Sequence, residues 1–376
     1  MYYIDNIRVY LTVLVILHHV AVAYGGSGGW PIKEPATDAV SPIIFLLFNA
    51  LNQSYFMSFF FILAGYFTPR SLERKGGASF IKGRLVRLGI PMLLYVIVLA
   101  PVTGWLVLNF AHNLGVPFSE VYRDSLKFTS LQNISFGHLW FLEALLIFAL
   151  AYVVHKNVSG GEKQGSTIKL YPDSFPPNKA IVLSIGVLSV LTFIVRIVYP
   201  IGVWVYSLSP SHMTHYAFSF IVGILAYRGD WFNRLTRDQA RLWGKIAVVN
   251  TVALPILFVA GVSGGASEQI FMGGVSWQAF MTATWESISF LSISIYLLYI
   301  FKSRFNTENK LLSWMAPNVF ATYIFHQIII VATMIPLLDM AWPSVLKFIV
   351  VSIIGVPLCF IVSSVIRKTP YADKVI

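Results

Sequence analysis

The chain has 376 residues, of which 57% are hydrophobic and only 11% are charged, and its mean hydropathy is +0.72. About a quarter of the residues of an ordinary soluble domain are charged, so this composition excludes a soluble globular protein and indicates an integral membrane protein. The single cysteine, Cys359, excludes a disulfide framework or a thiolate metal cluster within one chain, and we expect no metal site.

Ten apolar stretches are long enough to cross a bilayer as helices, which takes about 17 to 25 residues. They cover residues 7–24, 43–67, 88–110, 136–155, 180–199, 213–228, 246–262, 277–300, 311–335 and 344–366. The stretch 213–228 is the weakest, because it is short and contains His215. We therefore predict an all-α, polytopic fold of about ten transmembrane helices. We expect residues 1–376 to form a single integral membrane domain with no fused soluble domain.

The net charge of +11 would also suit a nucleic-acid-binding protein. The positions of the lysine and arginine residues along the chain decide between this function and a membrane topology. If the N-terminus is cytoplasmic, 22 of the 27 lysine and arginine residues lie at the cytoplasmic face. This alternation follows the positive-inside rule and predicts an N-in, C-in orientation without nucleic-acid binding. Ala21-Val22-Ala23 resembles a signal-peptidase site, but cleavage there would remove His19 and leave nine spans, so we favour an uncleaved first helix.

The first span contains His19 about three helical turns inside the membrane. At about 100° per residue, Asp5, Arg8 and Thr12 share one face of the helix with His19. A histidine at this depth is costly unless it faces a polar cavity or a partner, so His19 is the leading candidate for a functional residue. The neighbouring His18 points about 100° away, and its role stays open.

The connection after the second span is basic and includes Arg70, Arg84 and Arg87. Arg84 and Arg87 are three residues apart and are therefore neighbours on one helical face. Paired guanidinium groups can hold the phosphates of a donor such as a coenzyme A thioester. Alternatively, the same residues anchor the chain to lipid headgroups.

Three later spans carry further candidates. His138, Trp140 and Glu143 open the fourth span, where they either shape an outward-facing acceptor pocket or belong to the membrane interface. Tyr323 and His326 lie in the ninth span, and we expect His326 at a depth comparable to His19. An interhelical hydrogen bond is the alternative explanation for His326. Glu286 in the eighth span can pair with either histidine or with Arg196 of the fifth span.

Five motifs follow one another along the chain. They are Asp5-Asn-Ile-Arg8 with His19, Gly65-Tyr-Phe at the end of the second span, Arg84-x-x-Arg87 before Gly-Ile-Pro, His138-Leu-Trp-Phe-Leu142 and Tyr323-Ile-Phe-His326. As an ordered set they resemble the acyltransferase-3 family of integral membrane acyltransferases, and in particular its glucan biosynthesis protein C (succinyltransferase) branch. The resemblance extends from the first span to the ninth.

The resemblance implies transfer of an acetyl, succinyl or similar group from cytosolic acyl-CoA to a hydroxyl of a glycan or lipid-linked saccharide, in the plasma (bacterial inner) membrane. It maps the family's essential histidine onto His19 and its donor-handling arginines onto Arg84 and Arg87. We also assign Arg8 and Arg70 to donor binding, and His138, Trp140, Tyr323 and Glu286 to substrate binding. Membrane lipid is the remaining expected partner.

The residues suit this chemistry, because a neutral imidazole can take the proton of a hydroxyl as it attacks a thioester. We assign His19 as general base, with Glu143 and His326 in the catalytic group. A covalent acyl-histidine route is the alternative mechanism. The alternative function is a secondary transporter or flippase that uses intramembrane histidine and glutamate as a proton relay. A membrane scaffold without catalytic activity is the third functional hypothesis.

Overall fold

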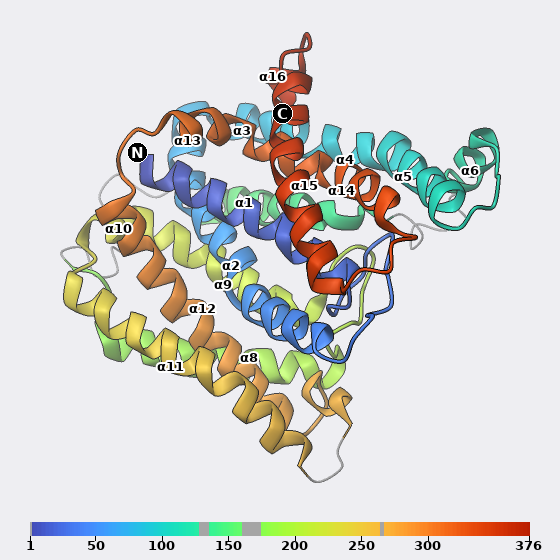
Figure 1. The fold of residues 1–376 in the computed structure, drawn as a ribbon. Helices are drawn as coiled ribbons and strands as arrows, with labels where there is room; N and C mark the ends of the chain where they lie inside the picture. Colours follow the sequence, from blue (N-terminus) through green and yellow to red (C-terminus); the bar gives the residue numbers. More distant parts are fainter. Residues whose placement is uncertain (1, 128–134, 160–173, 264–266) are drawn as a thin grey trace. The chain divides into compact units, whose positions relative to one another are not determined.

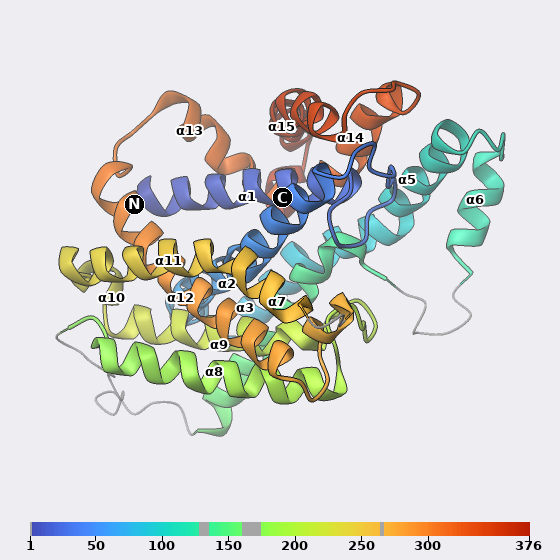
Figure 2. The same cartoon turned by 60° about the horizontal axis from the view of Figure 1, so that its bottom comes forward.

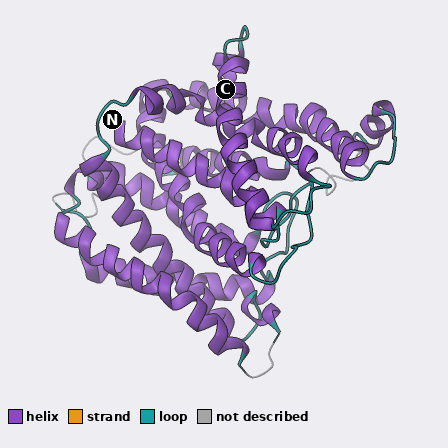
Figure 3. Cartoon of the chain, in the orientation of Figure 1, coloured by secondary structure: helices purple, strands orange, loops and turns teal. Residues whose placement is uncertain are grey.

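The computed structural model describes every residue except 1, 128–134, 160–173 and 264–266 (Figure 1). Residues 128–134 and 160–173 belong to two of the predicted connections and lie outside the described residues. Regular structure in the described ranges is helical, with one isolated bridge between Val205 and Leu208, and coil is confined mainly to connections such as residues 24–40 (Figure 3). The predicted all-α fold is confirmed.

Within the described residues, nine helical stretches are long and apolar enough to cross a membrane. They are Tyr2–Ala23 (α1), Ser41–Lys75 (α2), Gly77–Ala111 (α3 to η3), Gly137–Val158 (η5 and α7), Asn178–Val198 (α8), Arg237–Val262 (α11), Trp277–Arg304 (α12), Lys310–Leu337 (α13 to η8) and Ser344–Arg367 (α15). The chain is thus a multi-pass membrane protein.

The predicted span 213–228 forms helix α9, Pro210–Arg228, which is not among these nine. Its 19 residues include Ser211, His212, His215 and Ser219, which lower its hydropathy. Three of these four side chains are buried. Whether α9 crosses the membrane and whether both termini face the cytoplasm stay predictions.

The chain separates into two compact units, each assembled from distant segments. Unit 1 comprises Met1–Ile7, Gln53–Gly83 and Ala144–Thr307. Unit 2 comprises Arg8–Asn52, Arg84–Glu143 and Glu308–Ile376. Helices α1, α2 and α7 each contribute residues to both units.

Unit 1 is built mainly from α8, α9, α11 and α12, and it also contains the short α10, Trp231–Arg234, and η6, Glu268–Phe271. Helix α12 packs against both α8 and α11, and α8 also packs against α9 (Figure 2). The glycine of the Gly65-Tyr-Phe motif allows close helix packing here, because a Cβ at Gly65 would collide with the backbone carbonyl of Phe220.

Unit 2 contains α14, Val319–Met334, packed along α15, and the short helix α6, Phe118–Ser125, packed on α5, Ala100–Leu106. Helix α13, Lys310–Met315, and η7, Ala316–Asn318, precede α14, while η8, Ile335–Leu337, follows it. Helix α16, Ala372–Val375, lies near the C-terminus. The 3-10 turn η5, Gly137–Leu139, leads into α7, Trp140–Val158.

The third membrane stretch changes its helical period along its length. After α3, Gly77–Arg84, the π-helical segments Leu85–Gly89 (η1), Tyr95–Leu99 (η2) and Val107–Ala111 (η3) alternate with α4, Ile90–Leu94, and α5. The first two π segments end two residues before Pro91 and Pro101. Proline has no N–H and its ring clashes with a preceding carbonyl, which favours a widened turn just before it. This local geometry sets the positions of Arg87 in η1 and Tyr95 in η2.

Candidate functional site

Three histidines from three elements gather in unit 2: His19 of α1, His138 of η5 and His326 of α14. The ring centroid of His326 lies 5.3 Å from that of His19 and 4.6 Å from that of His138. His138 and His326 are buried, whereas His19 is partly exposed. All three were assigned to the site from the sequence, and the structure brings them together.

Trp30, which the sequence analysis missed, covers this group. Its ring is stacked on His19 at a centroid distance of 4.5 Å and an interplanar angle of 20°, and it lies 6.0 Å from His326 at 24°. Trp30 belongs to residues 24–40, the connection between α1 and α2. The sequence did contain a signal for Trp30, because it is a single tryptophan directly after the run Gly25-Gly-Ser-Gly-Gly29. No residue of that run has a side chain large enough to pack against the histidines.

A buried ion pair and a pair of hydroxyl contacts fasten this connection to α15. Lys347 donates to Glu34, and the Thr37 amide donates to the Ser344 hydroxyl at 3.3 Å. The Lys347 side chain is 3% exposed, so it is held in a desolvated position. These contacts, one at Glu34 and one at Thr37, hold the connection that contains Trp30 against α15.

The tautomer of His326 follows from its hydrogen bond. Its Nδ1 lies 2.7 Å from the backbone carbonyl oxygen of Tyr323, and a carbonyl oxygen only accepts. In the neutral ring, Nδ1 therefore carries the proton and Nε2 keeps its lone pair. This Nε2 is buried without a hydrogen-bond partner in the described part of the chain. The bond lies within α14, so His326 is oriented by its own helix as a base.

His138 is held in the opposite tautomer. Its Nε2 lies 3.0 Å from the Ile324 carbonyl oxygen, which leaves Nδ1 as the unprotonated nitrogen. Tyr323 supports this turn, because its hydroxyl donates to the His138 carbonyl oxygen. Gly137 adopts a φ of +51°, and a Cβ there would overlap the Tyr95 phenol, so glycine is required before His138.

His19 itself presents a buried Nδ1 that has no hydrogen-bond partner among the described residues. The ring of His18 meets it edge to face, with centroids 5.6 Å apart. In the first turns of α7, Trp140 contacts Phe141, whose ring in turn contacts Tyr323. Glu143 lies one turn beyond Trp140 in the same helix and belongs to unit 2.

Four arginines form a second feature of unit 2. Arg8 and Arg367 are charged neighbours of Arg87, and Arg84 is three residues before it. The Arg87 guanidinium lies 5.4 Å from the Phe320 ring centroid, while Arg367 donates to the Asn318 side-chain oxygen at 2.9 Å. Arg367, near the end of α15, was not singled out from the sequence because a terminal arginine is typical of positive-inside anchoring. The remaining predicted donor arginine, Arg70, lies in unit 1.

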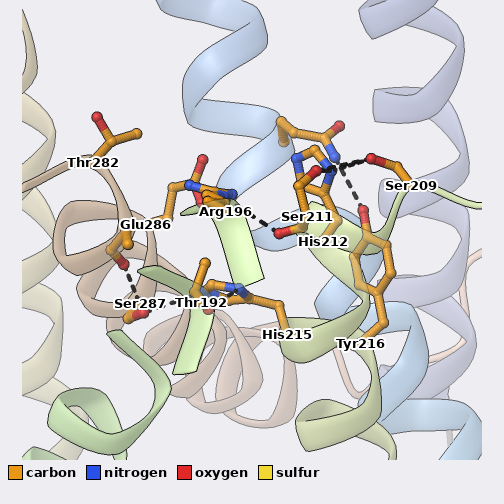
Figure 4. Close-up of polar contacts among 12 residues, drawn as sticks. Thr192, Arg196, Ser209, Ser211, His212, His215, Tyr216, Thr282, Glu286 and Ser287 are labelled. Carbon is orange, nitrogen blue, oxygen red and sulfur yellow. Dashed lines mark hydrogen bonds and ion pairs between the residues drawn. The ribbon is translucent and has the colours of Figure 1, made fainter. Parts of the chain in front are cut away.

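Unit 1 contains a separate buried polar cluster (Figure 4). Glu286 of α12 forms an ion pair with Arg196 of α8 at 2.5 Å, which is one of the two pairings the sequence allowed. Both ring nitrogens of His215 have hydroxyl partners, Thr192 at 3.2 Å and Ser287 at 3.3 Å. The Ser209 and Ser211 hydroxyls meet Nδ1 of His212. Glu286 thus compensates the charge of Arg196 inside unit 1 through Nη2, while Nη1 of Arg196 is buried without a partner among the described residues.

The three-histidine group suits proton transfer in a site with little water. Two of its rings have tautomers fixed by backbone carbonyls, and each leaves an unprotonated nitrogen for a proton. The four arginines suit the binding of a phosphorylated molecule, because an anion relieves the repulsion among their charges. Within the described residues, no group of three or more His, Cys, Asp or Glu side chains is arranged to hold a metal ion.

Comparison with known families identifies the family of the chain. The model of the acyltransferase-3 family, an acyltransferase domain, matches residues 1–364. The chain belongs to the acyltransferase-3 family. The predicted family is thereby confirmed, and the multi-pass helical fold is the one expected for it.

Two relatives of this acyltransferase-3 protein are both named glucans biosynthesis protein C. The protein of Escherichia coli strain K12 is 27% identical over 236 residues, which are 60% of this chain and 58% of the relative. That of Escherichia coli O81 strain ED1a is 26% identical over 270 residues, 69% of this chain and 64% of the relative. The chain thus spans about three fifths of the length of these relatives. No solved structure matches it.

Proposed function

We propose that this protein transfers an acetyl, succinyl or similar acyl group from cytosolic acyl-CoA to a hydroxyl of a glycan or lipid-linked saccharide, in the bacterial inner membrane. The observation that carries the proposal is the stacked group of His19, His326 and Trp30 in unit 2. Family membership supports the reaction class, and the name of the relatives supports a glucan acceptor.

His19 is the proposed general base, because it is the partly exposed member of the group. As the acceptor oxygen attacks the thioester carbonyl, His19 takes the hydroxyl proton, the new C–O bond forms and the C–S bond breaks. The proton then leaves with the thiolate as coenzyme A thiol. His326 and His138 each keep an unprotonated nitrogen in the buried group, so they stabilise the positive charge that His19 acquires. An acyl-histidine intermediate at His19 is the covalent variant of this mechanism.

The arginine group is the proposed donor site. Arg8, Arg84 and Arg87 would bind the phosphates of coenzyme A, and we add Arg367 to them; Arg70 stays a predicted donor residue from unit 1. Arg8 and His19 are eleven residues apart on α1, which is about 16 Å along the helix axis. The pantetheine arm must cover this distance, so the mechanism requires a passage for the donor from the arginines to the histidines.

Glu143 is the proposed orienting carboxylate, and His138, Trp140 and Tyr323 the proposed surroundings of the acceptor. Their positions in the first turns of η5 and α7 and in α14 support this assignment. Glu286, by contrast, is occupied by Arg196, which makes direct substrate binding by Glu286 the least supported of the assignments.

Purified protein in lipid nanodiscs, incubated with radiolabelled acetyl-CoA or succinyl-CoA and a saccharide, tests the proposal. We expect release of coenzyme A thiol and labelled saccharide, and a loss of about 10²- to 10⁴-fold for His19→Ala. His155→Ala, which alters an exposed histidine of α7, is the control. Unchanged turnover in His19→Ala would exclude it as the base.

The buried cluster of unit 1 supports one second candidate, a proton-coupled transporter or flippase. An ion pair beside two histidines in membrane helices is typical of proton pathways. Movement of a saccharide across liposomes without covalent change, abolished by Glu286→Gln, would favour it.

A further inference from the structure

A cavity of about 650 Å³ lies within unit 2, between the connection 24–40, the end of the third membrane stretch and helix α6. Its lining includes Pro31, Val107, His112, Glu120, Asp124 and Ser125. The volume lies within the usual range for small-molecule sites, about 300 to 1,000 Å³. None of the predicted site residues lines it.

The cavity has one apolar and one polar wall. Val107, Leu108 and Val121 provide the apolar side. On the polar side, the carboxylates of Glu120 and Asp124 are acceptors. Ser125 donates its hydroxyl proton to the Val121 carbonyl at 2.7 Å and keeps its lone pairs. A ligand with a C–H face and many hydroxyl donors, such as a sugar ring, complements these walls. Lys127 pairs with Asp124, so the charge that disfavours an anion here is mainly that of Glu120.

Asp124 remains ionised at neutral pH. Lys127 donates to it at 2.6 Å, and this hydrogen bond and charge hold the pKa of Asp124 below its usual range. The pair is exposed, so Lys127 does not bury the carboxylate.

The polar wall is held in place by α5 and η3. Trp105 donates from Nε1 to the Val116 carbonyl at 3.2 Å, and Asn109 donates to the same oxygen at 3.0 Å. The rings of Trp105 and Phe118 meet edge to face at the start of α6. These contacts fix the turn before α6, so the carboxylates stand on a supported element rather than on a free loop.

The cavity adjoins the histidine group through consecutive residues of one segment. Pro31 lines the cavity, and Trp30 is stacked on His19. The connection 24–40 follows the first membrane stretch and α6 follows the third, so both emerge on the same membrane face if each stretch crosses once. That face is the opposite one to Arg8, which lies near the start of α1.

We propose that this cavity is the acceptor subsite and that it binds a neutral saccharide, with Glu120 and Asp124 accepting hydrogen bonds from its hydroxyls and discriminating against acidic sugars. The inference rests on the proposed function for its reaction, but binding to the cavity can be measured without turnover. Trp30 then separates the bound sugar from His19 and is the surface along which the reacting hydroxyl reaches the base.

The test uses methyl glucoside and methyl glucuronoside, which differ by one carboxylate, with full-length protein in nanodiscs. We compare the wild type with the double variant Glu120→Gln, Asp124→Asn, and with Glu73→Gln as a control at an exposed carboxylate of α2. Like charges in a site cost enough for the wild type to prefer the glucoside by about tenfold or more, in binding and in transfer. We expect the double variant to lower this preference by at least about threefold. Glu73→Gln should keep both the sugar preference and the release of coenzyme A thiol at the wild-type values.

The outcomes separate the two proposals. Binding of the glucoside that depends on Glu120 and Asp124, without any acyl transfer, would retain the cavity and refute the proposed reaction. Transfer with an unchanged sugar preference in the double variant would overturn the cavity and leave the reaction intact. Absence of both binding and transfer in the wild type would overturn both.

Discussion

His215 of unit 1 and the three site histidines of unit 2 are paired in opposite ways, whereas His212 of unit 1 also keeps a buried Nε2 without a partner among the described residues. In unit 1, the Ser287 hydroxyl donates to the Ala283 carbonyl, so it accepts from Nε2 of His215, and Thr192 donates to Nδ1. Both nitrogens are used. In unit 2, His19, His138 and His326 each have one buried nitrogen without a partner among the described residues. Buried polar groups are normally satisfied, so the exceptions indicate where a proton or a substrate is to be bound.

The arginines of the two units also differ in their charged neighbours. Arg196 in unit 1 has Glu286 as its partner, whereas Arg87 in unit 2 has Arg8 and Arg367 as charged neighbours. A closed ion pair stabilises an arrangement, while a group of like charges is stabilised by an anion from outside. The proposed reaction accordingly uses the histidines and arginines of unit 2, and the ion pair of unit 1 is expected to stabilise the fold.

Replacing one histidine in each unit tests this contrast most strongly. We expect His326→Ala to lower kcat by about 10²-fold or more with little change in KM for the donor, because it removes a buried nitrogen that stabilises the positive charge on the base His19. His215→Ala should lower thermal stability and leave kcat per folded protein unchanged. Transferase assays on monodisperse protein, with melting curves, measure both. A large kcat loss in folded His215→Ala would break the contrast.

Glu286→Gln should have the largest effect on stability. It leaves the guanidinium of Arg196, which is fully buried, without its counter-charge, and breaking such a pair costs about 3 to 5 kcal/mol. The double variant Arg196→Met, Glu286→Gln should recover much of the loss, because no uncompensated charge remains. Thermal unfolding in nanodiscs measures the effect. A double variant as unstable as the single one would show that the pair has a role other than charge compensation.

Sequence reasoning found the family, the helical membrane class and the three histidines because those features are local. Histidine in an apolar run and arginine beside a span are visible without a fold. Trp30 and Arg367 were missed, since their importance arises from residues distant in sequence: Trp30 contacts His326, and Arg367 contacts Asn318. The span 213–228 was assigned from its apolar residues although it is short, and the buried Ser211, His215 and Ser219 show that its helix also directs polar side chains into unit 1.

Arg367→Gln sharpens the contrast between the two arginine environments. If Arg367 binds a phosphate of the donor, the variant should raise KM for acetyl-CoA by about tenfold, the usual size of one charged hydrogen bond. KM for acetyl-pantetheine, which lacks the nucleotide phosphates, should not change. Lys374→Gln, another basic residue near the C-terminus, is the matched control. An equal rise in KM for both donors would indicate a structural role for Arg367.

Asp38 offers the smallest test, because it acts on unit 2 only through the end of the segment that carries Trp30. Its Oδ1 accepts from the amides of Val40 and Ser41, and its Oδ2 accepts from the Ser41 hydroxyl at 2.6 Å, where α2 begins. These hydrogen bonds, the Ser41 hydroxyl first, hold the pKa of Asp38 below its usual range. A depressed pKa contributes stability above the unfolded-state value, about 3.9, and this contribution disappears as pH falls through the folded-state pKa.

Asp38→Asn keeps the Oδ1 acceptor and replaces Oδ2 with a group that cannot accept from Ser41. We therefore expect a small loss of thermal stability at pH 7 that shrinks as the pH is lowered below about 4 towards 2, with Asp38→Ala losing more at pH 7 because both acceptors are gone. Melting curves of the three proteins across this range measure the difference. A loss that is the same at pH 7 and at about pH 2 would mean that the charge of Asp38 does not hold the start of α2, and the anchoring of the Trp30 segment would then depend on Lys347 and Ser344 alone.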